Sequence, residues 1–132
     1  RALLTSSPEG TTQYIHHDAR DPQAILEAAA ESLDVKQPVA VMLLSVLHFL
    51  SDEDVRTTVG TLMEALPAGS FLAVAHGTTE YADDAVLRGM EHWNANSPTP
   101  IHLRTRDELA PLLLDGLELL EPGIVSCSRW RP

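Results

Sequence analysis

The stretch of residues 38–54, PVAVMLLSVLHFLSDED, constrains the fold of this chain more than any other part of the sequence. Apart from Ser45 and His48, every residue from 39 to 50 is apolar. Because polar and apolar residues do not alternate in its first half, the run is typical of a parallel strand covered on both faces. The acids after Ser51 form a capping box and predict the first turn of a helix. A buried strand that leads directly into a helix is typical of an α/β domain.

The same kinds of pattern predict further helices and strands along the chain. Asp21 is expected to cap a helix that has Pro22 at its first position. A second capping box, TRDE at residues 105–108, predicts another helix start. Beyond these, helices are predicted over residues 51–66 and 83–93. Strands are predicted over residues 11–16, 39–44, 71–75, 101–103, 117–120 and 124–128.

This order of elements predicts an α/β fold with mostly parallel strands and flanking helices. In such sheets, ligands bind beyond the carboxyl ends of the strands. Polar residues stand at those ends in three places: Asp18 after the first predicted strand, Ser45 to His48 after the second, and His76 after the third. The sequence therefore predicts a binding site on one edge of the sheet.

Composition narrows the class of protein and the kinds of partner. The chain has 132 residues, of which 44% are hydrophobic, and this suits one packed domain over residues 1–132. With 19 acidic residues against nine basic ones the formal charge is −10, so neither nucleic acid nor an anionic membrane is expected as a partner. The single cysteine, Cys127, and the absence of a secretory signal predict a cytoplasmic protein.

Four segments of the chain carry a resemblance to a known family. YIHHDARDP, PVAVMLLSVLHFLSDED, LPAGSFLAVAHGT and DGLELLEPGIVSCSRWRP resemble S-adenosylmethionine-dependent methyltransferases of an actinobacterial family whose substrates are largely unknown. The resemblance runs over essentially the whole chain, in order. It implies a Rossmann-like class I methyltransferase sheet and S-adenosylmethionine as the cofactor.

The resemblance also implies roles for particular residues. Asp18 matches the acid whose carboxylate accepts a hydrogen bond from the adenine amino group, and the backbone N–H of Ala19 would reach the adjacent ring nitrogen. The loop that lies against the methionine part of the cofactor and faces the acceptor matches Ser45, Val46, Leu47 and His48. From the residues alone, Asp18 is a loop carboxylate near Arg20 or a partner of the helix dipole. Adenine binding by Asp18 therefore rests on the resemblance.

The chain departs from the family in its glycines. The family holds its cofactor with a glycine-rich loop after the first strand. No two of the seven glycines in this chain are separated by a single residue, so no G-x-G motif exists. We therefore expect residues 1–132 to be the middle and C-terminal part of a methyltransferase domain. On this interpretation the isolated chain is inactive and binds the cofactor weakly. Its sheet is altered or exposed, with Val41, Leu43 and Phe71 still in the core.

His48 and His76 are the candidate catalytic residues. Both follow strands that are predicted to be neighbours about 4.8 Å apart, so the two side chains are expected to converge on one cleft. An imidazole there would accept a proton from a methyl acceptor or orient it. In the alternative interpretation, His48 bonds the start of the next helix and His76 a loop carbonyl. Metal binding by the two histidines is the weaker alternative, because no third ligand stands at a suitable spacing, and no metal site is predicted.

The resemblance thus implies methyl transfer from S-adenosylmethionine to a small-molecule acceptor. Nucleophilic catalysis by Ser45 is not expected, because the glycines of a G-x-S-x-G elbow are missing. Two alternatives stay open at this stage. One is another adenine-nucleotide enzyme, such as a dehydrogenase, and the other is a non-catalytic Rossmann-like module for binding or oligomerisation. The methylated atom and the oligomeric state also stay open.

Overall fold

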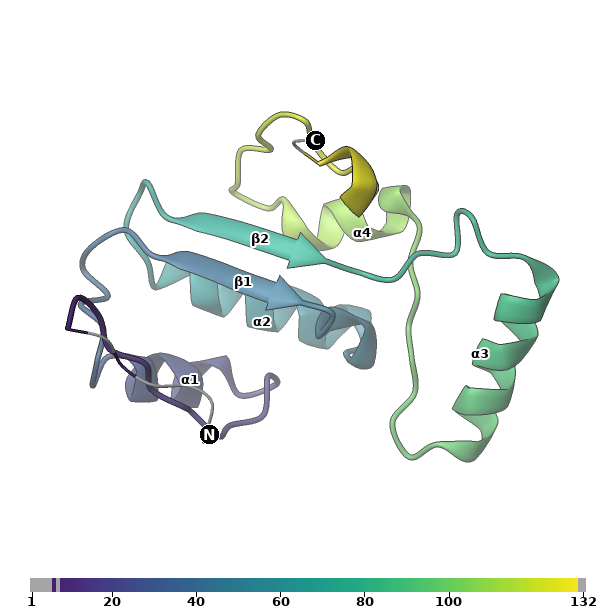
Figure 1. Ribbon diagram of the computed structural model, residues 1–132, viewed down its shortest axis with the longest axis horizontal. Helices are drawn as coiled ribbons and strands as arrows, with labels where there is room; N and C mark the ends of the chain where they lie inside the picture. Colours follow the sequence, from purple (N-terminus) through teal and green to yellow (C-terminus); the bar gives the residue numbers. More distant parts are fainter. Residues whose placement is uncertain (1–5, 7, 131–132) are drawn as a thin grey trace.

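The computed structural model of the chain describes residue 6 and residues 8–130. Strands and helices follow one another along the chain, and one helix projects from the rest (Figure 1). The helices are α1 (Pro22–Ala29), α2 (Asp52–Glu64), α3 (Asp84–Asn96) and α4 (Arg106–Leu113). The strands are β1 (Ala40–Leu44) and β2 (Phe71–Ala75), and short 3-10 turns cover Leu47–Phe49 and Cys127–Arg129.

Three helices begin at the residues that the capping patterns predict. The Asp21 carboxylate accepts from the backbone N–H of Ala24 at 3.1 Å, with Pro22 at the first helical position of α1. Ser51 Oγ accepts from the N–H of Asp54 at the start of α2. The capping box at Thr105 is complete, because the side chains of Thr105 and Glu108 each accept from the other's backbone N–H. These predictions are confirmed, since each cap satisfies a helix N–H that has no intrahelical partner.

The sheet joins two segments that lie 31 residues apart in sequence. β1 and β2 pair in parallel, from Ala40 opposite Phe71 to Leu44 opposite Ala75. α2 forms the crossover between them, as a parallel pair requires. The predicted α/β class is therefore confirmed, and the sheet among the described residues has two strands.

Several predicted strands are wrong. Residues 11–16, 101–103, 117–120 and 124–128 are not strands. In the last two regions, backbone groups that would pair with a neighbouring strand form hydrogen bonds within local turns. Gly123 N–H donates to Leu120 O, and Arg129 N–H donates to Ser126 O. β-prone residues form a strand only where another strand is beside them, and these segments have none.

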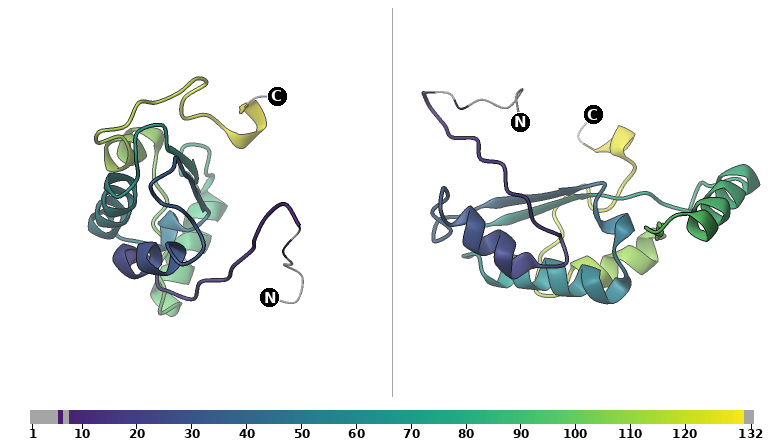
Figure 2. Two further views of the ribbon diagram at one scale, coloured as in Figure 1. Left: turned by 90° about the vertical axis from the view of Figure 1, so that its left-hand side faces the viewer. Right: turned by 90° about the horizontal axis from the view of Figure 1, so that it is seen from below.

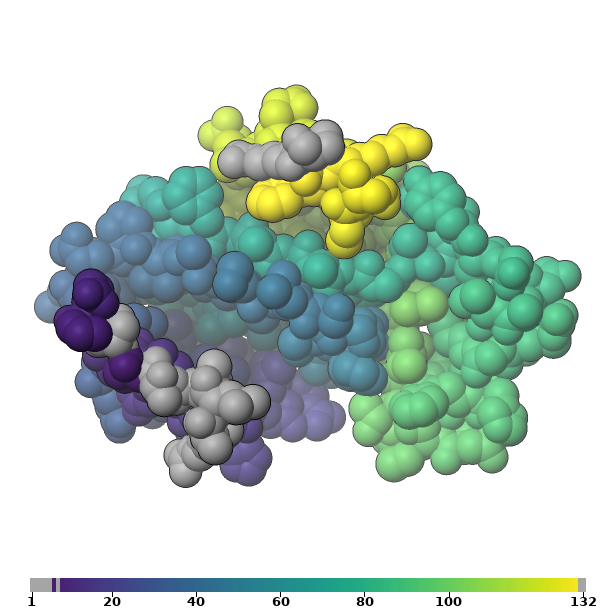
Figure 3. Space-filling view, in the orientation of Figure 1, coloured from purple at the N-terminus to yellow at the C-terminus, as the bar shows by residue number. Residues whose placement is uncertain are grey.

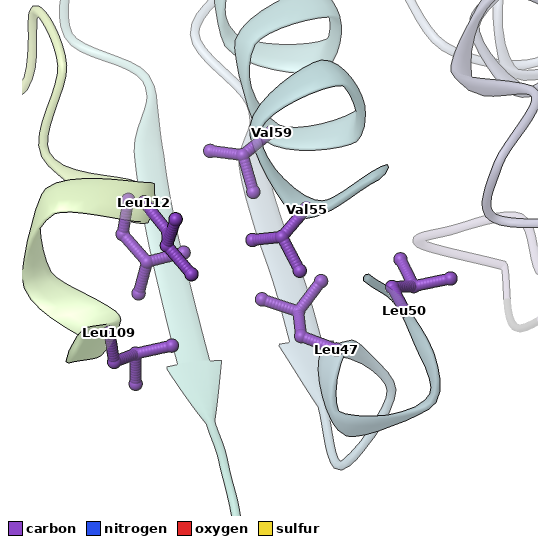
Figure 4. Close-up of a cluster of buried hydrophobic side chains, with 7 residues drawn as sticks. Leu47, Leu50, Val55, Val59, Leu109 and Leu112 are labelled. Atoms are coloured by element: carbon purple, nitrogen blue, oxygen red, sulfur yellow. The ribbon is translucent and has the colours of Figure 1, made fainter. Parts of the chain in front are cut away.

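The core lies between the sheet and the helices on one of its faces. Figure 2 shows α1, α2 and α4 on the same side of the two strands. The turn after β1, the buried stripe of α2 and the inner face of α4 meet in one cluster (Figure 4). Its members are Leu47, Leu50, Val55, Val59, Leu109, Leu112 and Leu113. Burying each of these side chains contributes about 1.5–3 kcal/mol.

The opposite face of the sheet is open, so the prediction of a strand covered on both faces is wrong. Val41 and Leu43 are half-buried toward the helices. On the other face Met42 is 65% exposed and Leu44 54%. Phe71, which pairs with Ala40 on this same face, was predicted to be core but is 59% exposed. Figure 3 shows side chains of both strands at the surface of the molecule. The expectation of an exposed sheet is confirmed by these exposed side chains, and none of the α-helices α1, α2 and α4 lies on this face (Figure 2).

The helix α3 projects from the rest of the molecule (Figure 1). None of its residues is buried, although it presents apolar side chains on one side. It runs to Asn96, past the predicted end at Trp93. The returning chain binds to it: Trp93 Nε1 donates to Thr99 O at 2.9 Å, and the Asn94 side chain both donates to and accepts from the backbone of Ile101. Helix α3 and residues 97–103 therefore form a hairpin-like arm.

Candidate functional site

The two strands end side by side and bring the predicted histidines together. Ser45 N–H donates to Ala75 O at 2.9 Å, which extends the ladder by one residue beyond β1. Ser45 has a φ of 57°, a left-handed conformation that is uncommon for a residue with a side chain and is often found at functional sites. The rings of His48 and His76 are 5.9 Å apart between centroids, at an interplanar angle of 85°. The two side chains therefore lie close together, as predicted, but of the two only His48 lines one of the grooves described below.

A buried arginine organises this end of the sheet. Arg104 is only 4% exposed. Its guanidinium donates to the carbonyls of Leu47 at 3.1 Å and Leu50 at 2.7 Å, and binds Asp52 at the start of α2. It thereby fastens the turn after β1 to the helix that follows and to the segment before α4. A charge buried in this way is stable only because its donors are paired.

His76 is bound at both ring nitrogens. Arg104 Nη1 lies 3.0 Å from His76 Nε2, and His76 Nδ1 contacts the carbonyl of Gly77. Because a guanidinium only donates, Nε2 accepts and Nδ1 carries the proton that is donated to Gly77. Burial lowers the pKa of His76, the Gly77 carbonyl opposes this, and the nearby charge of Arg104 lowers it further. His76 therefore makes the bond to a loop carbonyl that the alternative interpretation predicts, and its catalytic role stays a prediction.

His48 is different, because no described residue forms a hydrogen bond with its ring. Its Nδ1 is shielded from solvent and has no hydrogen-bond partner among the described residues. The predicted alternative, a bond to the start of α2, is absent there. The ring lies 4.2 Å from that of Phe49, between centroids. Burial, followed by the charge of Arg104, lowers the pKa of His48, so the imidazole is neutral near pH 7 and able to accept a proton.

A first groove of about 380 Å³ lies beside the segment before α1. Asp18, Ala19 and Val46 line it, so three of the predicted cofactor residues come together. The Asp18 carboxylate also accepts from Arg20, through the side chain at 2.7 Å and the backbone N–H at 2.9 Å. The side-chain hydrogen bond from Arg20 is the main reason that the pKa of Asp18 falls to about 2. Asp18 is therefore an ionised acceptor at the groove.

A second groove, of about 410 Å³, lies between the end of β1 and the arm formed by α3. Ser45 and His48 line it from the sheet side. Its other walls are formed mainly by apolar side chains of α3 and of the returning chain: Val86, Met90, Trp93, Ile101 and Leu103. The predicted site residues are thus divided between two grooves, and the loop of residues 45–50 contributes to both.

The sequence model of a family described as S-adenosyl methyltransferase matches residues 1–132, which is the whole chain. The chain belongs to this family. Its fold is similar to the crystal structure of a DUF574 family protein from Streptomyces avermitilis, with 42% identity and a TM-score of 0.89 over 99% of this chain and 50% of that one. It is also similar to a candidate methyltransferase from Thermobifida fusca, with 32% identity and a TM-score of 0.75 over 88% of this chain and 43% of that one. The chain thus spans half or less of the length of these structures, and no curated protein matches it.

S-adenosylmethionine is the cofactor implied by this S-adenosyl methyltransferase family, and the first groove suits its adenine end. The adenine amino group donates a hydrogen bond and the ring nitrogen beside it accepts one. Asp18 has a carboxylate that can accept, and Ala19, the next residue, has a backbone N–H that can donate. Apolar side chains of Phe49 and Leu50 line the same groove and suit the flat base. The residues present therefore fit this part of the cofactor.

One predicted cofactor residue, Leu47, lies in the core, and its contact with the cofactor stays a prediction. The Leu47 side chain has no exposed surface and belongs to the core cluster, and its carbonyl accepts from Arg104. The 3-10 turn at Leu47–Phe49 turns this side chain inward, so it does not face either groove. Leu47 anchors the loop, while Val46 on one side and His48 on the other line the grooves.

Two residues that position the site were not predicted from the sequence. Thr58, which is buried in α2, donates from Oγ1 to the carbonyl of Ala19 at 3.0 Å. This bond holds the segment with Asp18 against the core. Arg104 is one of nine basic residues in the sequence. A polar residue within the apolar stripe of α2 was the available signal for Thr58, and no comparable signal marks Arg104.

No group of three or more His, Cys, Asp or Glu side chains among the described residues is placed to hold a metal ion. No helix in the same residues has the length and apolar character needed to cross a membrane.

Proposed function

We propose that the protein containing this chain transfers a methyl group from S-adenosylmethionine to a small-molecule acceptor. The observation that supports this most directly is the loop of residues 45–50, which lines both grooves. One groove has the acceptor and donor groups that suit adenine, and the other is apolar with an imidazole at its wall. An enzyme that joins two substrates needs two such sites at a common boundary, because alignment of the reacting groups lowers the barrier.

The residues of this chain have distinct tasks in that reaction. Asp18 and the backbone of Ala19 bind the adenine edge, and Ser45 and Val46 lie toward the methionine part. When bound, S-adenosylmethionine supplies an electrophilic methyl group. His48 accepts the proton that the acceptor loses, since a neutral imidazole without a hydrogen bond is available for it. His76, held by Arg104, supports the wall behind His48.

On this proposal residues 1–132 are the middle and C-terminal part of one methyltransferase domain. The described residues contain two strands and no glycine-rich cofactor loop. The rest of the cofactor site would then come from outside this chain. The test is therefore made on the natural full-length protein.

The experiment is isothermal titration of the full-length protein with S-adenosylhomocysteine. We expect micromolar binding, weakened about tenfold or more by Asp18→Asn, which keeps the shape of the side chain but removes its charge. The matched control is Asp21→Asn, because asparagine caps a helix as well as aspartate and Asp21 is three residues away. Absence of binding in the wild-type protein, or equal binding by both variants, would refute the assignment of the adenine site.

A further inference from the structure

The second groove has a chemical character that limits what it can hold. Its volume of about 410 Å³ is in the range of sites for small organic ligands. No residue that lines it carries a formal charge, and two of the lining residues are glycines, Gly77 and Gly89. Polar side chains enter it only from the end of β1, as Ser45 and His48. The groove is thus apolar along the arm and polar at one end.

The polar end contains an unsatisfied group. His48 Nδ1 is shielded from water and bonded to nothing among the described residues. Because Nδ1 has no surface that a ligand could reach, Nε2, which is not among the shielded atoms and has no hydrogen-bond partner among the described residues, is the nitrogen that His48 offers to the groove. His76, 5.9 Å away, is fully paired by Arg104 and Gly77, so the same region satisfies one imidazole and leaves the other open.

We propose, resting on the function above, that this groove holds the methyl acceptor and that the acceptor is an uncharged, largely apolar ring compound presenting one hydroxyl group to His48. The apolar walls of Met90, Trp93 and Leu103 bury the ring. An ionised acceptor is disfavoured, because a charge placed among these side chains loses its hydration without gaining a partner. The donors of Arg104 do not compensate, since they are committed to Asp52, His76 and backbone carbonyls.

The transfer step balances with these groups. The acceptor hydroxyl gives its proton to a ring nitrogen of His48. Its oxygen forms a bond to the methyl carbon of the sulfonium donor, and the carbon–sulfur bond breaks with its electron pair remaining on sulfur. The products are the methyl ether and the neutral thioether. The imidazolium then releases its proton to water, which restores His48.

A steric variant tests the location of the acceptor without altering a polar group. A Cβ built on Gly89 has no heavy atom within 4 Å, so Gly89→Leu projects into open space from α3 and is compatible with a helix. Gly60→Leu is the matched control, because Gly60 is also helical, its Cβ likewise meets nothing within 4 Å, and it does not line the groove. If Gly89→Leu fails to fold by circular dichroism, Gly89→Ala replaces it.

The probe is 2-naphthol, titrated calorimetrically into the full-length protein saturated with S-adenosylhomocysteine. We expect 2-naphthol to bind at least tenfold more tightly than the charged 2-naphthoate. Gly89→Leu should weaken 2-naphthol binding at least fivefold, and Gly60→Leu should leave it unchanged. In 15N spectra the imidazole signals of His48 should shift with 2-naphthol but not with naphthalene.

Two results would overturn this inference. One is equal binding of 2-naphthol and 2-naphthoate, and the other is binding that Gly89→Leu does not weaken. Binding of S-adenosylhomocysteine is measured separately. If S-adenosylhomocysteine binds and 2-naphthol does not, the proposed class of acceptor is refuted while the proposed function stands. Failure of S-adenosylhomocysteine to bind would instead refute the proposed function itself.

Discussion

Arg104 Nη1 donates to His76 Nε2 across 3.0 Å, joining two residues that lie 28 positions apart in sequence. The bond fixes the proton of His76 on Nδ1 and orients the ring toward His48. The same guanidinium binds the carbonyls of Leu47 and Leu50. One side chain therefore positions the end of β2, the loop after β1 and the start of α2.

Arg104→Leu should destabilise the protein by about 2–4 kcal/mol, because it leaves buried carbonyls without donors. Urea unfolding followed by circular dichroism measures the change. Arg106→Leu is the control, since Arg106 is exposed and two residues away, and its effect should stay within about 0.5 kcal/mol. Similar losses in both variants would argue against a special role for Arg104.

The stability of the protein should fall as the pH decreases from 7.5 to 5.5. The folded pKa values of His48 and His76 are lowered by burial, so the unfolded chain binds protons more readily in this range. The two histidines contribute fully to the free energy of unfolding above their pKa in the unfolded chain, about 6.5. This contribution is lost as the pH falls through their lower pKa values in the folded protein. Asp18 and Glu108, whose pKa values are also lowered, lose their contributions at more acidic pH.

A variant of His76 identifies the source of this pH effect. His76→Gln keeps a donor and an acceptor but does not titrate. The difference in unfolding free energy between pH 7.5 and 5.5 should be smaller in this variant than in the wild type. An identical difference would assign the effect to other groups.

Thr58→Val should cost about 1–2 kcal/mol of stability, because it removes the donor to the Ala19 carbonyl while keeping the shape of the side chain. It should also weaken S-adenosylhomocysteine binding severalfold, since that bond holds the segment with Asp18 in place. Thr57→Val, on the exposed side of the same helix, is the matched control for both measurements. Tighter binding by the Thr58 variant would contradict this role.

Two leucines on either side of the end of β1 should respond differently to truncation. Leu47→Ala should cost about 2–5 kcal/mol, because the side chain is fully buried and its removal leaves a cavity. Leu44→Ala should cost about 1 kcal/mol or less, since Leu44 is 54% exposed on the open face of the sheet. Chemical denaturation of this chain compares them directly. Equal losses would mean that the open face is covered in solution.

His48→Ala in the full-length protein should slow methyl transfer about 100-fold or more, because general bases typically contribute that much. Its affinity for S-adenosylhomocysteine should change less than twofold, since His48 lines the second groove and not the first. His92→Ala, at an exposed histidine of α3, is the control. Unchanged turnover with the true acceptor would assign His48 a structural role.

The sequence by itself determined the local elements. The caps at Asp21, Ser51 and Thr105 define helix starts through hydrogen bonds between residues three positions apart. Because both partners of each bond lie within four consecutive residues, the local sequence is enough to predict it. The apolar runs of β1 and β2 were also recognisable. The resemblance to the family, carried by contiguous segments, located the loop after β1 and the acid at residue 18.

Only the tertiary structure decided which of these residues act together. Leu47 and His48 are adjacent in sequence, yet one is in the core and the other lines a groove, because a 3-10 turn rotates successive side chains in different directions. The β-prone segment 11–16 formed no strand, since strand formation depends on a partner that local sequence does not specify. Arg104 became central through bonds to residues 28 to 57 positions away. Such long-range pairing depends on how the chain packs, and burial makes it strong by removing competing water.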